Sequence, residues 1–330
     1  MEIISDIEKV KKGCILTIGN FDGVHIGHRE ILKVARETAA QKSAELVAMT
    51  FQPHPAAILY PEKAPGVLTP LEVKEKLLAQ FGVDKLIVVA GGLDFLQLEP
   101  LSFLKKFLVK NIHPAVVVEG DDFNFGAKRA GNINTLCKFG DEKSFEVILV
   151  EAKKATLSAS GQTVKVSSTM IRYMLTSGNV TDTADCLGRA YKLVGKIIKG
   201  KGIGQKLGFP TLNLEKPNQI IPAEGVYAGM VKVSETLEQV CEANCDIPAV
   251  FSIGQARTFG NQHPLLIEAH LLIKDADEII GKWMAMDFVE YIRKQHKFTT
   301  PEELSAQIAK DCQKAKNILV LCRNPTGVNP

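Results

Sequence analysis

Two histidines lie in a glycine-containing loop near the start of the chain, within LTIGNFDGVHIGHREIL at 16–32. The apolar run at 14–18 is typical of a short buried strand. After the loop, apolar residues repeat with helical spacing: Ile31, Leu32, Ala35 and Ala39. The stretch therefore predicts a strand, a tight loop and a helix start, whose free backbone N–H groups can bind phosphate. His25 and His28 would lie side by side in the first helical turn.

Three other segments carry polar side chains next to predicted strands or helices: TFQPHP at 50–55, GDDFNFG at 120–126 and VSSTMIR at 166–172. Each is weak evidence alone, because hydroxyls before a helix are usually only caps. Together they would place imidazoles, hydroxyls, N–H groups and a guanidinium at one sheet edge, which suits a triphosphate. The candidate phosphate-binding residues are Gly19, Asn20, Phe21, Gly23, Ser167, Ser168 and Thr169, with His25, His28 and Arg172.

Taken alone, the two-histidine loop fits other interpretations. It could be a glycine turn with one surface and one core histidine. It could also be a metal-binding pair, although a third ligand is not evident in the sequence. Cys241 and Cys245 similarly lack a second ligand pair of zinc-site spacing.

Alternating strands and helices in the first half predict the framework for these residues. Continuous apolar strands separated by helices indicate a parallel sheet covered on both faces, and such sheets bind ligands at the carboxyl ends of their strands. Thr69 and Glu72 form a predicted capping box around Pro70, and another helix is predicted through 100–111. The expected strands are 14–19, 44–51, 85–90, 114–119 and 145–150.

From about Tyr191 the pattern changes to short, β-branched segments broken by glycine, which predicts an antiparallel barrel. A closing helix is expected from Thr300-Pro301-Glu302-Glu303, and the tail RNPTGVNP is expected to fray. The predicted domains are 1–183 and 184–330.

Composition limits the class of protein. The 330 residues are 45% hydrophobic and 23% charged, enough for two globular domains. A net charge of +3 does not favour a nucleic-acid partner, and apolar runs of membrane-spanning length are not found. Without a recognisable signal peptide, the seven cysteines are expected to be reduced thiols in a cytoplasmic protein. The oligomeric state stays open, a homo-oligomer included.

The combination of GNFDGVHIGH, TFQPHP, GDDFNFG and VSSTMIR resembles the N-terminal half of the bacterial bifunctional riboflavin kinase/FAD synthetases. Four later segments resemble the flavokinase half of these enzymes: GKIIKGKGIGQKLGFPTLNL, GVYAG, IEAHLL and PEELSAQIAKD. The resemblance covers nearly the whole chain in the right order. It implies an α/β fold: a Rossmann-like nucleotidylyltransferase domain with a parallel sheet, then an antiparallel β-barrel kinase domain with a C-terminal helix.

For the first domain, the resemblance implies FMN adenylyltransferase activity, in which FMN and ATP give FAD and pyrophosphate. The attacking group is already an anionic phosphate, so the work is positioning and charge stabilisation rather than proton removal. His25, His28 and Arg172 suit that role. Asp122, Phe123 and Phe125 fall in the loop that is expected to position the flavin substrate.

For the second domain, the resemblance implies phosphorylation of riboflavin to FMN by ATP with Mg²⁺. Glu268 matches the catalytic glutamate, although from the residues alone it reads more simply as an acidic residue on an exposed strand face. Thr211 and Asn213 match the magnesium ligands, with oxygen atoms that suit a hard cation. A glycine-rich flap is expected over the phosphates, with Gly200, Gly204 and Gly208 as phosphate-binding positions and Gly202 among its glycines.

The kinase motifs depart from the family pattern at several positions. Lys199 stands where the family usually has histidine, Gln205 where it has arginine, and Leu212 between the threonine and asparagine; SIGQARTF at 252–259 also differs. One alternative is therefore a single-function FAD synthetase with an inactive, flavin-binding C-terminal domain. A non-catalytic flavin or nucleotide sensor is another, which the intact histidine pair disfavours.

Overall fold

The computed structural model describes residues 1–4, 10–200, 202–242, 244–255, 265–273 and 280–323. Residues 324–330 of the tail that is predicted to fray and residues 256–259 of the divergent SIGQARTF stretch lie outside them, whereas Arg323, the first residue of that tail, is helical. The chain forms two compact units, each considered by itself. One comprises Met1–Ala155 with Thr163–Ser168, and the other Thr156–Gln162 with Thr169–Pro330.

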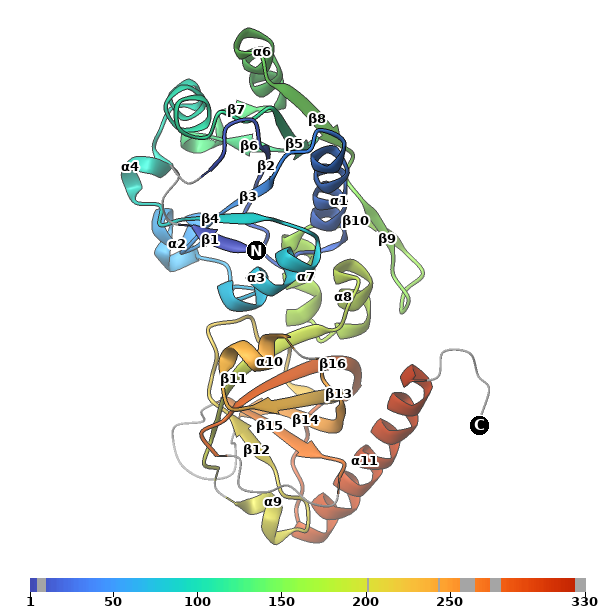
Figure 1. The fold of residues 1–330 in the computed structure, drawn as a ribbon. Coiled ribbons are helices and arrows are strands. Elements are labelled where there is room, and N and C mark those ends of the chain that lie inside the picture. The colour runs from blue at the N-terminus through green and yellow to red at the C-terminus, as the bar shows by residue number, and fades with distance from the viewer. Residues whose placement is uncertain (5–9, 201, 243, 256–264, 274–279, 324–330) are drawn as a thin grey trace. The chain divides into compact units, whose positions relative to one another are not determined.

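The first unit is built on the predicted parallel sheet, with strand order β1-β4-β3-β2-β5-β8 (Figure 1). Strand β2 lies between β3 and β5, so the chain order changes direction at β2. The loops that follow β2 and β5 therefore meet at the edge where such sheets bind ligands. The strands are β1 (Glu2–Ile4), β2 (Ile15–Ile18), β3 (Leu46–Phe51), β4 (Lys85–Val89), β5 (Val116–Gly120) and β8 (Glu146–Val150).

The side chains of these strands alternate between two faces of the sheet that are both buried, as the continuous apolar sequences predict. One face contributes Leu16, Ile18, Val47, Met49 and Val117 to a core that includes Phe103 and Phe107. Helix α1 packs against β2 and β5. The helices of this part of the chain are α1 (Ile26–Gln41), α2 (Pro55–Leu59), η2 (Pro61–Lys63), α3 (Leu71–Gln80), α4 (Leu93–Leu96), α5 (Pro100–Ser102), η3 (Phe103–Ile112), η4 (Ala127–Arg129) and α6 (Ile133–Lys143).

Two details of the helices differ from the sequence prediction. The helix predicted through 100–111 is one α-helical turn followed by a π-helix, η3, over Phe103–Ile112. The capping box at Thr69 is wrong: α3 starts at Leu71 after Pro70, without a side-chain cap. The Thr69 hydroxyl instead accepts a hydrogen bond from the N–H of Gly23 at 3.1 Å, because the histidine loop packs on this turn.

The sequence prediction also missed several short strands. Edge strand β1 pairs in parallel with β4, and two small antiparallel pairs accompany the main sheet. They are β6 (Asn124–Phe125) with β7 (Gly131–Asn132), and β9 (Lys154–Thr156) with β10 (Thr163–Lys165). Each spans only two or three residues, too few for alternation to be recognised.

The second unit contains the predicted antiparallel barrel, closed in the order β11-β12-β15-β14-β13-β16. Closure depends on β16, which pairs with β11 on one side and β13 on the other. The strands are β11 (Tyr191–Ile198), β12 (Leu212–Leu214), β13 (Gly225–Ser234), β14 (Ile247–Gln255), β15 (Leu265–Leu271) and β16 (Trp283–Arg293).

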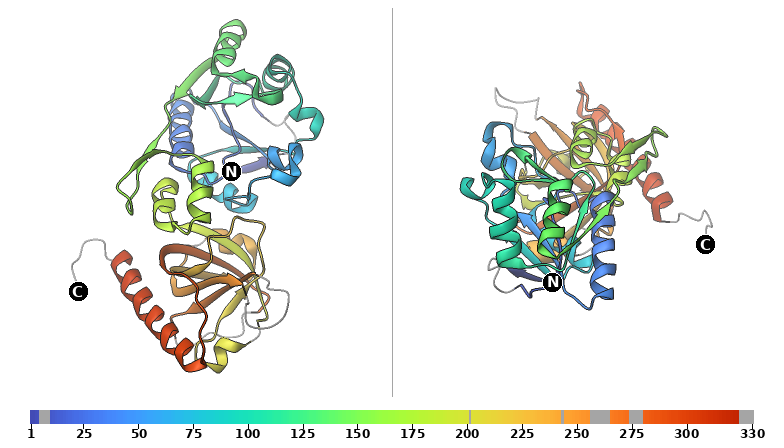
Figure 2. Two further views of the ribbon diagram at one scale, coloured as in Figure 1. Left: turned by 180° about the vertical axis from the view of Figure 1, so that it is seen from behind. Right: turned by 90° about the horizontal axis from the view of Figure 1, so that it is seen from above.

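The closing helix α11 (Pro301–Arg323) runs along the outside of the barrel, against β13, β14 and β16 (Figures 1 and 2). The predicted start signal is confirmed, since the Thr300 hydroxyl accepts from the N–H of Glu303 at 3.2 Å. The guanidinium of Arg293 donates three hydrogen bonds to the buried carboxylate of Asp311, which fixes this helix to the last strand. The remaining helices are α7 (Ser168–Thr176), α8 (Val180–Leu187), α9 (Ile203–Lys206) and α10 (Leu237–Glu242).

Candidate functional site

The two histidines lie where β2 leads into α1, and their rings stack. The ring centroids of His25 and His28 are 3.6 Å apart with planes 15° from parallel. His25 is the N-cap of α1, and its Nδ1 accepts the N–H of His28 at 3.3 Å. Gly27 lies beneath this ring: a Cβ there would be 3.2 Å from it, tighter than ordinary packing. The spacing of HIGH thus lets a histidine cap its own helix and stack on the next histidine.

The ring of His28 packs between the rings of His25 and Phe21. Its ring meets Phe21 edge-on, with centroids 5.3 Å apart, and its Nδ1 is buried without a hydrogen-bond partner in the described part of the chain. Burial lowers the pKa of His28 well below its ordinary value, and the neighbouring His25 and Lys74 lower it further. Both effects favour the neutral imidazole of His28, a hydrogen-bonding group rather than a fixed cation.

The loop before the histidines adopts a strained path that its neighbours hold in place. Phe21 and Val24 have φ of 45° and 39°, a region that side chains with a Cβ rarely adopt. The buried carboxylate of Asp22 accepts hydrogen bonds from the backbone N–H groups of Leu68 and Thr69. Ser168 donates its hydroxyl to the carbonyl of Asp22 at 2.8 Å, which places this predicted residue on the loop.

Two ionisable side chains that the sequence analysis missed also hold this loop. Glu119, at the end of β5, is 2% exposed and accepts the N–H of Ile18 at 2.6 Å. Burial raises the pKa of Glu119 well above its ordinary value. Lys74, in α3, is 5% exposed and donates to the carbonyl of Asn20 at 2.8 Å. The usable signal for Lys74 was its place among Val73, Leu77 and Leu78 on the buried face of its helix.

The other predicted residues of the first unit have separate surroundings. Asp122 is largely exposed and pairs with Lys165 at 2.8 Å. Phe123 is half-buried and stacks on Phe125, which itself is buried and contacts Phe103. Gly19 lies against the Phe21 ring and Gly23 has a φ of 92°. Ser167 belongs to the same unit, whereas Thr169 and Arg172 belong to the second unit.

In the second unit, strand register brings the predicted kinase residues together. Glu268 in β15 pairs with Asn213 in β12, and the Thr211 hydroxyl donates to the Glu268 carboxylate at 3.4 Å. Burial raises the pKa of Glu268, and the bond from Thr211 opposes that shift. Glu268 is half-buried rather than solvated, unlike an ordinary acidic residue on an exposed strand face.

The glycines of the predicted flap have two distinct uses. Gly200 and Gly204 are sites of close approach: a Cβ would lie 2.1 Å from the Asn213 amide and 2.4 Å from the Phe209 carbonyl oxygen, respectively. Gly202 and Gly208 have φ of 69° and 83°, where glycine is favoured. Their neighbours Lys199 and Gln205 are exposed. Leu212 is half-buried. The glycines therefore fix the backbone around Asn213 and Thr211.

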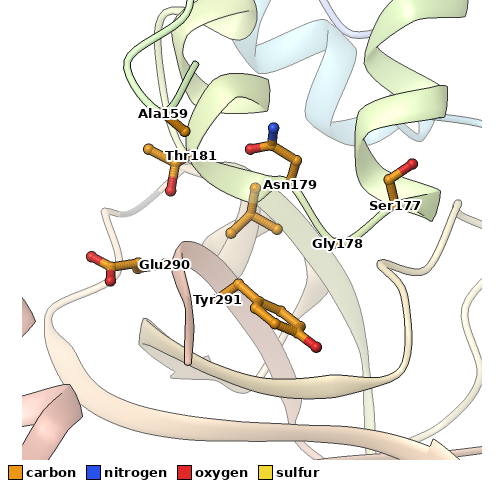
Figure 3. A pocket seen from close by; sticks show the side chains of 8 residues that line it. Ala159, Ser177, Gly178, Asn179, Thr181, Glu290 and Tyr291 are labelled. Carbon is orange, nitrogen blue, oxygen red and sulfur yellow. The ribbon is translucent and has the colours of Figure 1, made fainter. Parts of the chain in front are cut away.

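A hollow of about 460 Å³ lies elsewhere in the second unit, between the α7–α8 turn and β16 (Figure 3). Two of its polar side chains bond within the protein, since Asn179 caps α8 and Thr181 donates to the carbonyl of Val289. The predicted site residues lie outside it. The lining consists of Ala159, Ser177, Gly178, Asn179, Val180, Thr181, Glu290 and Tyr291.

Groups of three or more His, Cys, Asp or Glu able to hold a metal ion do not occur within the described ranges. Cys241 is buried in α10, and Cys245 contacts Lys192. Within the same ranges, each helix is too short or too polar to cross a lipid bilayer.

Comparison with known proteins covers both units. The family model for FAD synthetase matches residues 7–170, and that for riboflavin kinase matches 187–319. The bifunctional riboflavin kinase/FMN adenylyltransferase of Escherichia coli K12 is 33% identical over 95% of each chain. That of Listeria monocytogenes is 34% identical over 94% of this chain and 93% of its own. A Streptococcus pneumoniae structure described as a macrolide-efflux protein superposes with a TM-score of 0.81 at 26% identity, over 96% and 98% of the two chains.

Proposed function

Because the chain belongs to the family of bifunctional riboflavin kinase/FMN adenylyltransferases, with both catalytic domains present, we propose roles for its residues in the two reactions. The enzyme phosphorylates riboflavin to FMN and transfers the adenylyl group of ATP to FMN, which gives FAD and pyrophosphate. This supports the bifunctional interpretation over a single-function synthetase. The domain limits we propose remain 1–183 for adenylyl transfer and 184–330 for the kinase.

Adenylyl transfer is proposed to take place on the loop between β2 and α1. A phosphate oxygen of FMN attacks the α-phosphorus of ATP and forms a new P–O bond. The bond between the α-phosphorus and the oxygen that bridges to the β-phosphate breaks, and pyrophosphate leaves. A general base is unnecessary because the attacking oxygen is anionic. His25 and His28 would donate hydrogen bonds to phosphate oxygens, and Ser167, Ser168, Thr169 and Arg172 would complete the phosphate-binding set.

The proposed nucleotide loop would be shaped by Gly19, Asn20, Phe21 and Gly23. The flavin substrate would be positioned by Asp122, Phe123 and Phe125. The stacked histidine pair at the switch point of the sheet is the observation that carries this assignment.

Riboflavin phosphorylation is proposed to depend on Glu268 as general base. The carboxylate would accept the proton of the riboflavin 5′-hydroxyl as its oxygen attacks the γ-phosphorus of ATP and ADP leaves. The desolvated setting of Glu268 suits a base, because burial raises the pKa of its carboxyl group.

Magnesium fits the oxygen donors beside Glu268. The Thr211 hydroxyl and the Asn213 amide supply neutral oxygens, and phosphate oxygens of ATP would complete the coordination, as is usual for Mg²⁺. The bound cation would neutralise charge on the phosphates. Gly200, Gly204 and Gly208 would allow the backbone to approach them. We also propose that the enzyme works on small molecules in the cytoplasm, with no nucleic-acid or membrane partner, and that its oligomeric state includes homo-oligomers.

The experiment that tests the two assignments separates the reactions. The purified chain is incubated with Mg²⁺-ATP and either riboflavin or FMN, and riboflavin, FMN and FAD are separated by chromatography. Both FMN from riboflavin and FAD from FMN are expected. Failure to form FMN at high ATP and Mg²⁺ would contradict the kinase assignment alone.

A further inference from the structure

Lys74 is a buried lysine whose hydrogen bonds go to neutral atoms. Its Nζ donates to the carbonyl oxygen of Asn20 at 2.8 Å and to the hydroxyl of Thr50 at 3.4 Å. The Thr50 hydroxyl donates to the same Asn20 carbonyl at 3.1 Å. The lysine thus lies directly beneath the predicted phosphate loop, with its charge facing neutral oxygens.

The carboxylates that act on Lys74 do not offset the cost of its burial. Asp22 and Glu75 act on it through space and favour its charged form, yet desolvation outweighs both and lowers the pKa of Lys74. Asp22 already accepts hydrogen bonds from the N–H groups of Leu68 and Thr69. A buried charge with weak compensation is expensive unless something supplies the opposite charge.

Two polar atoms of the loop and of the first turn of α1 have unmet hydrogen-bonding capacity. The side-chain oxygen Oδ1 of Asn20 and Nδ1 of His28 are buried without partners among the described residues. The positive charge of Lys74 also acts on His28, since it is among the causes that lower the pKa of this ring. The lysine and the histidine pair therefore act on one small region, which attracts negative charge.

We propose that Lys74 is a positioning residue for adenylyl transfer, whose buried ammonium supplies the fixed positive charge that draws the pyrophosphate part of ATP onto the Asn20 loop. It acts through the carbonyl of Asn20 and through its electric field rather than by direct contact. Bound polyphosphate in turn compensates the buried charge. The ligand class is a di- or triphosphate, and the same charge assists release of the pyrophosphate leaving group by stabilising its developing anion.

The test uses the full-length enzyme with three substitutions. Lys74→Gln keeps a hydrogen-bond donor near the Asn20 carbonyl but removes the charge, and Lys74→Met removes both. Lys33→Met, at an exposed lysine of α1, makes the same change in net charge away from the loop. The reverse reaction, from FAD and pyrophosphate to FMN and ATP, gives the KM for pyrophosphate. Thermal unfolding of the ligand-free protein and FMN formation from riboflavin are measured on the same preparations.

Both Lys74 variants should raise the KM for pyrophosphate by about tenfold or more, the scale of one lost charge interaction at intermediate dielectric. Lys33→Met should match the parent, and FMN formation should persist in all three. The unfolding midpoint of ligand-free Lys74→Met should equal or exceed that of the parent, because an uncompensated buried charge is gone. Retention of the parent KM by Lys74→Gln would overturn the proposal, since the hydrogen bond alone would then suffice. A lower midpoint in Lys74→Met with unchanged KM would overturn it too, by showing a purely structural lysine.

Discussion

The two proposed catalytic regions are organised by different means. On the sheet, buried ionisable side chains hold the loop: Glu119 binds the N–H of Ile18, Asp22 binds the Leu68–Thr69 backbone, and Lys74 binds the carbonyl of Asn20. In the barrel, strand register places Glu268 beside Asn213, and glycines let the backbone come close. The first arrangement responds to charge and pH, whereas the second depends on main-chain geometry. Substitutions should therefore affect the two reactions separately.

The largest expected effect falls on the barrel. Glu268→Gln keeps the shape of the side chain but cannot accept a proton, so FMN formation from riboflavin should fall about 10²–10⁴-fold. FAD formation from FMN, assigned to the other unit, should stay near the parent rate. Both rates are measured on one preparation by chromatographic separation of riboflavin, FMN and FAD. Glu302→Gln, at an exposed position in α11, is the control, and an undiminished FMN rate in Glu268→Gln would exclude Glu268 as the base.

The reciprocal change on the sheet is expected to be somewhat smaller. His28→Ala removes one hydrogen-bonding group from the proposed phosphate site, and FAD formation from FMN should fall about 10²–10³-fold. Riboflavin phosphorylation should persist, which also reports an intact barrel. If FAD formation is unchanged in a variant with the parent circular dichroism spectrum, the phosphate-binding role of the pair is wrong.

The accuracy of the fold and site predictions depends on the length of each strand and on whether charged residues are buried. The long apolar strands and the change to β-branched, glycine-broken segments correctly predicted a parallel sheet followed by a barrel. Strand β1 and the pair β6–β7 are too short to carry a period. Predictions failed most where a charged residue is buried, because charge normally indicates solvent exposure. Asp22, Lys74 and Glu119 were missed for this reason, and the role of Thr69 was misassigned because the loop that it binds is 46 residues away in sequence.

A pH experiment sharpens the comparison further. The folded-state pKa of Glu119 is raised, so between the ordinary pKa of glutamate and that higher value the folded protein keeps a proton that the unfolded chain has lost. The contribution of Glu119 to the free energy of unfolding is therefore fully present at acid pH and is lost as pH rises through the folded pKa. The loss amounts to about 1.4 kcal/mol for each unit by which the folded pKa exceeds the unfolded one.

Glu119→Gln keeps an acceptor for the Ile18 N–H without this titration. It should unfold at higher denaturant concentration than the parent at pH 8, with a gap that narrows toward pH 5. Glu37→Gln, on the exposed side of α1, should show no such trend. A gap that is constant with pH would contradict the buried titration.

The smallest expected effect concerns the exposed Gln205 in α9. A guanidinium can bind phosphate oxygens through two parallel hydrogen bonds and carries a positive charge. A glutamine amide is neutral and cannot form that pair of bonds. Gln205→Arg should lower the ATP concentration needed for riboflavin phosphorylation by a few-fold, on the order of 1 kcal/mol or less in binding. Steady-state kinetics at varied ATP compare the two forms. An unaltered ATP dependence would show that residue 205 does not face the nucleotide.

The double pairing of β16 sets an order of events during synthesis of the chain. The six parallel strands are complete once residue 150 has been made, whereas β11 and β13 stay unpaired at their outer edges until residues 283–293 emerge from the ribosome. Pairing across so long a sequence separation is slow, and open strand edges recruit other chains. A nascent or prematurely ended chain that stops before Trp283 would therefore expose two unpaired strand edges, on which other chains could add.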